Sequence, residues 1–263
     1  KRSNLTIKTH AQVRNLIFDG TKAVGVAYTD RTGNVQTAHA QKEVILSAGA
    51  VGSPHILMLS GIGPAEHLQD MGIDVLYNLP GVGQNLDDHP DFVLKYKCKQ
   101  PVSFWPKTKP LAKLAAGIQW ITTRSGIVAS NLFEGLGCVR SGPGVEYPDL
   151  QIIISPIAVD DSTWEPLQEH AFQIHVGLMR SHSRGKIELR SSDPSDPPRI
   201  LVNYLKDARD RELMRKGIRL VRELVDQPAF SDLKGDEIFP GNDVRSNEDL
   251  DQVLNTHTTT QWH

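Results

Sequence analysis

The sequence is poor in cysteine and has no long apolar runs, and each absence excludes a class of protein. Only two of the 263 residues are cysteines, Cys98 and Cys138. Neither has a partner at the spacing of a metal site or a disulfide framework, so we expect two free thiols. No stretch approaches the ~20 apolar residues of a membrane-spanning helix. The net charge of −2 leaves no basic excess that would indicate a nucleic-acid partner.

Two motifs that would define a site are also missing. No Gly-x-Gly-x-x-Gly occurs, so the chain contains no phosphate-binding start of a dinucleotide-binding βαβ unit. No Gly-x-Ser-x-Gly occurs either, which argues against a serine hydrolase. His89 follows Asp87 and Asp88, a pattern that suggests a metal site at first sight. Adjacent aspartates point apart on most backbones, so we predict no metal.

One stretch, residues 42–64, organises the rest of the sequence. Its apolar run at 43–46 is typical of a strand that ends at the small residues 47–50. Ser53-Pro54 then predicts a helix start, and Gly61 predicts its end. A strand, a small-residue crossing and a helix N-terminus together suit a cofactor that lies across a sheet. The spacing alone favours an ordinary tight βα connection, because isolated glycine motifs are weak signals.

The remaining sequence alternates between strand and helix patterns, which predicts an α+β fold. Strands separated by turn residues predict a three-stranded antiparallel meander in the first part and an antiparallel sheet in the second. A change in character near residue 89 predicts a domain boundary there. The predicted strands are 4–10, 11–18, 23–28, 35–40, 73–77, 92–98, 132–140, 150–157, 171–180, 186–190 and 200–204. The predicted helices are 64–71, 111–123, 207–227 and 246–255.

Two motifs carry a family resemblance. Residues 49–64 read Gly-Ala-Val-Gly-Ser-Pro-His-Ile-Leu-Met-Leu-Ser-Gly-Ile-Gly-Pro, which resembles the second signature of the glucose–methanol–choline (GMC) oxidoreductases, a family of flavoenzymes. Residues 79–89, Leu-Pro-Gly-Val-Gly-Gln-Asn-Leu-Asp-Asp-His, resemble the segment by which these enzymes leave the flavin domain. The resemblance implies that the chain is a middle fragment of such an enzyme, inactive and free of flavin when alone.

The resemblance also implies a domain organisation and a cofactor. Residues 1–89 would be the second part of the FAD-binding domain. Residues 90–245 would be a substrate-binding domain, an antiparallel sheet with flanking helices, and 246–263 would return toward the flavin. The cofactor would be FAD.

Within the family, the second half of the chain is similar to the choline-oxidising members. The similarity rests on residues 129–134, 169–181, 183–185 and the tail 255–263. It implies oxidation of choline to betaine aldehyde by hydride transfer to FAD, with electrons passed onward to an acceptor such as quinone and an association with a bacterial or mitochondrial membrane. Oxidation of another alcohol, by an oxidase or a dehydrogenase, stays open. So does a non-oxidising relative, either a lyase or a silent binding module.

The resemblance assigns five residues to the flavin side. Val13 would face the adenine end of FAD, although its position also suits plain strand packing. Ala48 and Gly49 form the small-residue crossing at the cofactor. His263, with Trp262 beside it, would lie over the flavin and act on the hydroxyl proton, a role suited to a side chain that titrates near neutrality.

Glu134 is the candidate substrate-binding residue. A carboxylate within an apolar strand is costly to bury unless a partner compensates its charge. The ordinary explanations are that Glu134 faces solvent or pairs with Arg140 or Arg180. Choline is a permanent cation without N–H donors, so its recognition requires aromatic faces and a nearby carboxylate. The resemblance places Glu134 at the trimethylammonium end.

Overall fold

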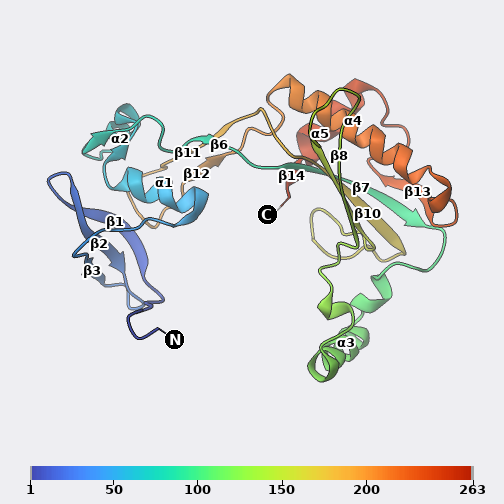
Figure 1. The fold of residues 1–263 in the computed structure, drawn as a ribbon, viewed down its shortest axis with the longest axis horizontal. Coiled ribbons are helices and arrows are strands. Elements are labelled where there is room, and N and C mark those ends of the chain that lie inside the picture. The colour runs from blue at the N-terminus through green and yellow to red at the C-terminus, as the bar shows by residue number, and fades with distance from the viewer. Residues whose placement is uncertain (1, 262–263) are drawn as a thin grey trace. The chain divides into compact units, whose positions relative to one another are not determined.

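A computed structural model describes residues 2–261 and divides the chain into two compact units (Figure 1). The first unit combines residues 1–87 with 184–203, and the second combines 88–183 with 204–263. The sequence instead placed 184–203 in the second domain and treated 246–263 as a separate segment. The roles assigned to these domains stay predictions.

The first unit begins with the predicted meander. Its strands run in the order β1 (Gln12–Asp19), β2 (Lys22–Thr29) and β3 (Val35–His39), all antiparallel. The first turn contains Gly20 with a φ of 57°, a conformation that glycine adopts without steric cost. No strand forms at 4–10, where one was predicted.

The helix of the organising stretch starts earlier than predicted. It is α1 (Gly49–Leu59), with Ala48 at its N-cap, and Pro54 lies inside it. Ser53 still serves the helix start, since its Oγ accepts a hydrogen bond of 3.0 Å from the Ala48 N–H. Gly61, with a φ of 80°, follows the helix end as predicted.

The strand predicted at 43–46 is wrong. The segment is not assigned as a strand, and Ile45 is 78% exposed. A strand needs a hydrogen-bonded neighbour, and no described segment pairs with this one. Downstream, α2 (Ala65–Asp70) forms as predicted, whereas the strand predicted at 73–77 shrinks to β5 (Tyr77–Asn78), which pairs in parallel with β4 (Ile62–Gly63).

A second small sheet completes the first unit and explains why 184–203 belongs to it. β6 (Gln84–Leu86) pairs with β11 (Gly185–Glu188), which pairs with β12 (Arg199–Leu201). Ile187 and Leu189 bring apolar side chains into a core with Met58, Leu68 and Val82. Hydrophobic burial, together with the pairing of β11 to β6, therefore holds this distant segment to the first unit.

The second unit contains the predicted antiparallel sheet. Its order is β13 (Lys234–Phe239), β7 (Pro90–Cys98), β10 (Ala171–Leu178), β9 (Leu150–Ser155) and β8 (Gly135–Val139), with β14 (Thr259–Thr260) also beside β7. Two helices, α4 (Ala208–Val225) and α5 (Asn247–His257), pack against one face (Figure 1). We call this the helix-covered face and the opposite one the front face.

The helices of the second unit form where the sequence pattern predicted them. The α4 stripe of Met214, Ile218, Val221 and Val225 is buried in the core. Asp207 caps α4 by accepting a hydrogen bond of 2.9 Å from the Arg209 N–H, and Ser246 with Asp249 forms the predicted capping box of α5. Short 3₁₀ turns lie at Trp105–Thr108, Ile127–Ala129 and Pro228–Phe230. The predicted helix α3 (Pro110–Thr123) forms too, although its apolar residues, such as Leu111 at 83%, are exposed.

Candidate functional site

The three predicted flavin-side residues that the structure describes all lie in the first unit. Val13 is half-buried in β1 and pairs with Tyr28 of β2. Ala48 and Gly49 are exposed at the start of α1. Gly49 has a φ of 81°, and nothing lies within 4 Å of the place where its Cβ would be. The turn is therefore open to a ligand, and only glycine adopts its conformation readily.

Trp262 and His263 lie outside the described residues, but the segment that leads to them is well anchored. Thr259 and Thr260 of β14 pair with Asp91 and Pro90 of β7. The Gln261 N–H then donates a hydrogen bond of 3.2 Å to the carbonyl oxygen of His89. The chain is thus fixed to the sheet up to two residues before the candidate catalytic histidine.

Glu134 lies in the second unit, directly before β8 rather than inside a strand. Its side chain is exposed, and Oε1 accepts a hydrogen bond of 3.0 Å from Ser130 Oγ. The Glu134 N–H donates to Ile154 O at 3.0 Å and so fixes the backbone. Neither Arg140 nor Arg180 forms an ion pair with it in the described part of the chain. The carboxylate therefore stays available to a cation from outside.

A cavity of about 560 Å³ adjoins Glu134 on the α3 side. One charged group besides the carboxylate lines it, the ammonium of Lys107, and most of the remaining wall is apolar. The full lining is Phe104, Lys107, Ala112, Ala115, Ala116, Gln119, Gly126, Ile127, Ser130 and Glu134. Small apolar walls beside a carboxylate suit methyl groups that carry a positive charge.

Buried polar residues gather on the front face of the sheet, a cluster that the sequence reading missed. Asp91 and Lys95 come from β7, Gln173 and His175 from β10, and Ser155 from β9. Lys95 is paired with Asp161 at 2.6 Å. The sequence does contain a signal for this cluster. Polar residues recur at alternate positions of otherwise apolar strands, and alternate positions of a strand share one face.

His175 is the most connected member of this cluster. Its Nδ1 lies 2.6 Å from Asp91 Oδ2, and its Nε2 lies 2.9 Å from Gln173 Nε2. The Phe133 ring meets the imidazole edge-on, with ring centroids 5.8 Å apart. Phe133 is the residue before Glu134 in the sequence, so His175 contacts the immediate neighbour of the candidate substrate residue.

His55 and His67 of the first unit have structural surroundings. His55 Nε2 is buried without a hydrogen-bond partner, and burial lowers the pKa of its imidazole, while Asp196 opposes that shift. The ring is therefore favoured in its neutral form. His67 Nε2 accepts a hydrogen bond of 3.0 Å from the Leu189 N–H, which ties α2 to the segment after β11.

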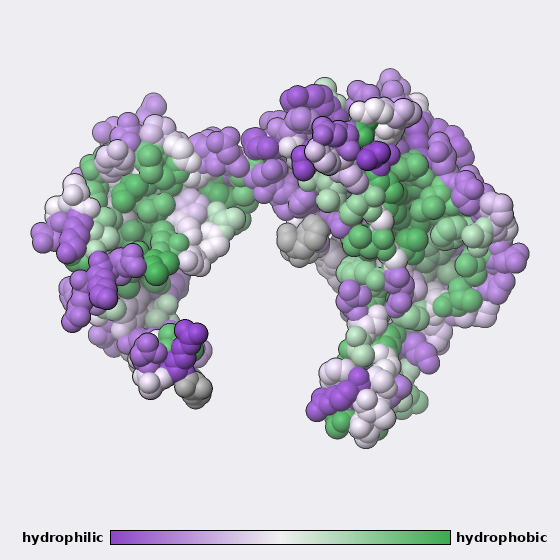
Figure 2. Space-filling view, viewed as in Figure 1, coloured by the Kyte–Doolittle hydropathy of each residue, from purple (hydrophilic) through white to green (hydrophobic). Residues whose placement is uncertain are grey.

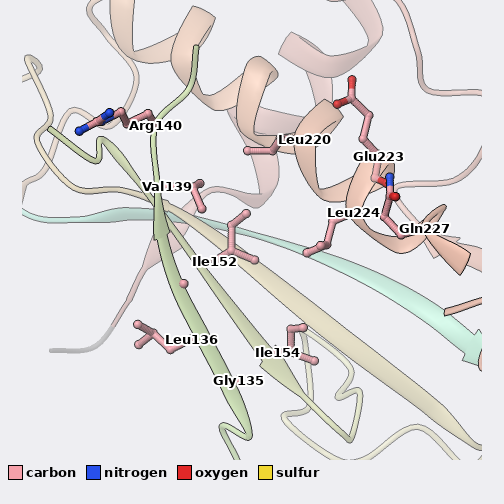
Figure 3. A pocket seen from close by; sticks show the side chains of 11 residues that line it. Gly135, Leu136, Val139, Arg140, Ile152, Ile154, Leu220, Glu223, Leu224 and Gln227 are labelled. Carbon is pink, nitrogen blue, oxygen red and sulfur yellow. The ribbon is translucent and has the colours of Figure 1, made fainter. Parts of the chain in front are cut away.

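A second depression lies on the helix-covered face, between α4 and the edge strand β8. Figure 2 shows hydrophobic residues gathered on this side of the second unit, and Figure 3 shows the lining side chains. The groove measures about 610 Å³ and is lined by Gly135, Leu136, Gly137, Val139, Arg140, Ile152, Ile154, Leu220, Glu223, Leu224 and Gln227. Glu134 does not line this groove, and the cluster that contains Asp91 and His175 lies on the opposite, front face, which is the candidate site.

Residues 2–261 contain neither a candidate metal site nor a candidate membrane-spanning helix. No three His, Cys, Asp or Glu side chains come close enough together to bind a metal ion. Within the same range, none of the helices has both the length and the apolar character that crossing a bilayer requires.

The family comparisons agree with one another. A family model described as GMC oxidoreductase matches residues 1–91 with its N-terminal part and residues 181–263 with its C-terminal part. Together the two matches cover well over half of the chain. An oxygen-dependent choline dehydrogenase of Pseudomonas savastanoi is 47% identical over the whole chain, and one of Chromohalobacter salexigens is 45% identical. The chain covers 46% and 47% of these relatives, about half their length.

Solved structures give the same fold. A formate oxidase from Aspergillus oryzae, described for the modification of its FAD, matches with a TM-score of 0.88 at 26% identity, over 96% of this chain and 49% of its own. Pyridoxine 4-oxidase from Mesorbium loti matches with a TM-score of 0.82 at 26% identity, over all of this chain and 47% of its own. Both neighbours are named as oxidases of small molecules, and the description of the formate oxidase names FAD.

Proposed function

This chain belongs to the GMC oxidoreductase family, and from that membership we propose that the protein is an FAD-dependent dehydrogenase that oxidises choline to betaine aldehyde. The observation that carries the choline assignment is Glu134, a carboxylate without a described ion-pair partner, beside a cavity with small apolar walls. The names of the relatives at 44–47% identity support the same substrate.

The open turn at Ala48 and Gly49 is the part of the chain that would hold the cofactor. Its residues are small and exposed, no side-chain cap covers the N-terminus of α1, and the first helical turn has no acidic residue. Unfilled N–H donors and the positive end of a helix favour an electron-rich group. These residues fit FAD, and Val13 on the neighbouring strand β1 would contribute backbone groups at its adenine end.

The reaction divides between the cofactor and the protein. FAD supplies the hydride acceptor when it is bound. The protein must hold the trimethylammonium group and remove the hydroxyl proton. Glu134 would hold the trimethylammonium group through its negative charge, and the alanines of α3 would contact the methyl groups. His263 would remove the hydroxyl proton, because imidazole exchanges protons readily near neutral pH.

Oxidation of another small alcohol is the competing function. It is favoured by the neighbour named pyridoxine 4-oxidase, because pyridoxine is an alcohol. Pyridoxine is not a quaternary ammonium ion. The charge of Glu134 therefore separates the two functions, because a carboxylate attracts a cationic substrate more strongly than a neutral one.

The test is reduction of the flavin by substrate. The full-length, FAD-loaded protein is mixed anaerobically with choline, with 3,3-dimethylbutan-1-ol or with pyridoxine, and the flavin absorbance is followed. We expect choline to bleach the flavin fastest at low concentration. Bleaching by pyridoxine alone would replace choline with another alcohol, and no bleaching by any alcohol would contradict the oxidoreductase function. Oxygen consumption then distinguishes an oxidase from a dehydrogenase that uses a quinone.

A further inference from the structure

Asp91 and His175 form a buried pair at the centre of the front face. The two side chains are 3% and 17% exposed, and His175 Nδ1 lies 2.6 Å from Asp91 Oδ2. They come from the neighbouring strands β7 and β10. A histidine that donates one ring N–H to a carboxylate has its ring orientation and tautomer fixed, which is how proteins position imidazoles that serve a site.

Gln173 fixes which nitrogen carries the proton. The Val159 N–H donates a hydrogen bond of 3.1 Å to Gln173 Oε1, so the amide must turn its NH₂ group toward His175. The NH₂ group only donates, and His175 Nε2 must accept. The proton therefore lies on Nδ1, facing Asp91.

The pair contacts residues that lie one or two positions before the two proposed site residues, Glu134 and His263. On one side, the His175 ring meets Phe133 edge-on at 5.8 Å between ring centroids, and Phe133 is the residue before Glu134. On the other side, Asp91 Oδ1 lies 3.5 Å from Gln261 Nε2, two residues before His263. Thr259 of the same segment pairs with Asp91 through the backbone.

Gly177 makes room for the second contact. It follows His175 by two residues on β10 and so lies on the same face. A Cβ added at Gly177 would lie 1.8 Å from Gln261 Nε2, closer than any real contact. The absence of a side chain at this position lets the segment before His263 lie against Asp91.

We propose that His175 is a positioning residue with two separable contacts, and this inference rests on the proposed function. Its ring holds Phe133 and through it Glu134, which sets the affinity for the cationic end of the substrate. Its Nδ1–H holds Asp91 in the orientation that receives Gln261, which anchors the segment that precedes His263 and thereby affects the rate of alcohol oxidation.

Two substitutions at one position separate these contacts. His175→Asn keeps a donor for Asp91 and removes the ring, whereas His175→Phe keeps a ring for Phe133 and removes the donor. In the full-length, FAD-loaded protein, His175→Asn should weaken binding of the non-oxidisable ligand glycine betaine by about three- to tenfold, the range of a lost aromatic pair. Flavin reduction at saturating choline should stay within about threefold.

His175→Phe should give the opposite pattern. Glycine betaine binding should change little, while flavin reduction at saturating choline should slow by about ten- to a hundredfold, the scale of a misplaced catalytic group. If this variant does not fold because Asp91 loses its donor, Asp91→Asn tests the same contact at nearly unchanged shape. His257 provides matched controls, since its ring contacts Phe239 at a tilt of 51° outside the network, and His257→Asn and His257→Phe should leave both readouts unchanged.

A spectroscopic readout is independent of catalysis. In the full-length protein labelled with ¹⁵N-histidine, long-range ¹H–¹⁵N spectra should contain an imidazole signal with its proton on Nδ1 that disappears in His175→Asn. If the signal lost in that variant has its proton on Nε2 alone, or if binding and rate fall equally in both variants, the inference is overturned. If choline reduces no flavin in the unsubstituted protein, the proposed function fails while the tautomer result still stands.

Discussion

Arg222 of α4 and Glu237 of β13 form a buried ion pair that joins helix to sheet. Nη2 lies 2.6 Å from Oε1 and Nε lies 3.0 Å from Oε2, with the side chains 14% and 3% exposed. The Tyr96 hydroxyl donates to Oε2 at 3.1 Å. Burial, and next the charge of Glu237, raise the pKa of Tyr96, so this tyrosine stays a donor throughout the ordinary pH range.

Removal of one partner should lower the free energy of unfolding by more than the intact pair adds to it. Glu237→Ala leaves the Arg222 charge buried without its carboxylate, and we expect the free energy of unfolding to fall by about 3–5 kcal/mol. Denaturant unfolding of the full-length protein measures this. Glu212→Ala is the control, because its pair with Lys216 at 2.8 Å is exposed, and it should lower the free energy of unfolding far less. Equal losses in the two variants would show that burial of the pair is unimportant.

Asp210 should make the second unit sensitive to acid. The side chain is fully buried and accepts hydrogen bonds from Ser181 Oγ, the His182 N–H and the Ser183 N–H at 2.9, 2.8 and 2.7 Å. Burial alone would raise its pKa, but the hydrogen bonds from Ser183 and His182 together outweigh it and lower the pKa below its ordinary value of 3.8.

The sign of the pH effect follows from that lowered pKa. At pH values between the lowered pKa of the folded state and the ordinary value of 3.8, the unfolded chain binds more protons than the folded chain. The stabilisation that ionised Asp210 provides is therefore complete above the unfolded pKa and is lost as pH falls through the folded pKa. Denaturation midpoints measured against pH should therefore fall less steeply below about pH 4 in Asp210→Asn. The exposed control Asp243→Asn should retain the wild-type slope, and a matching slope in Asp210→Asn would contradict the assignment.

Gly49 should be required at the cofactor turn. With a φ of 81°, Gly49→Ala forces a side chain into the left-handed region at a cost of about 1–2 kcal/mol. We expect weaker retention of FAD as well, measured by the flavin-to-protein absorbance ratio during dilution. Gly81→Ala is the control, since Gly81 has open space around it and no positive φ. Equal FAD loss in both variants would remove Gly49 from the cofactor site.

Local sequence signals predicted the local structure well. The apolar stripe of α4, the capping box at Ser246 and the meander follow from spacing within a few residues, and each is present. The predictions failed where partners are distant. The segment at 43–46 lacks a neighbouring strand, and β11 joins the first unit because it pairs with β6, about a hundred residues earlier.

The candidate site shows the same limit. Glu134 and Gly49 stand in recognisable motifs, whereas Asp91 and His175 are 84 positions apart and meet only through pairing of β7 with β10. No local pattern links a carboxylate on one strand to an imidazole on another. Alternation within each strand indicated which face a residue would occupy, and the fold alone determined its partner.

His263 is predicted to handle the hydroxyl proton. In the full-length, FAD-loaded protein, His263→Ala should slow flavin reduction by about two to four orders of magnitude, the usual contribution of general acid–base catalysis. Choline binding should change much less, because the cationic end contacts Glu134. Anaerobic stopped-flow at varied choline concentrations separates rate from affinity. An unchanged limiting rate would show that the tail does not carry the catalytic histidine.

The most direct test of the account compares choline with its neutral isostere in the Glu134→Gln variant. The substitution keeps the shape of the side chain and its contact with Ser130, and removes only the charge. From anaerobic flavin reduction in the full-length protein, we predict that choline binding weakens by about 1–3 kcal/mol, whereas 3,3-dimethylbutan-1-ol, which never used that charge, binds nearly as before. Equal losses for the two alcohols, or none for either, would contradict choline recognition by Glu134.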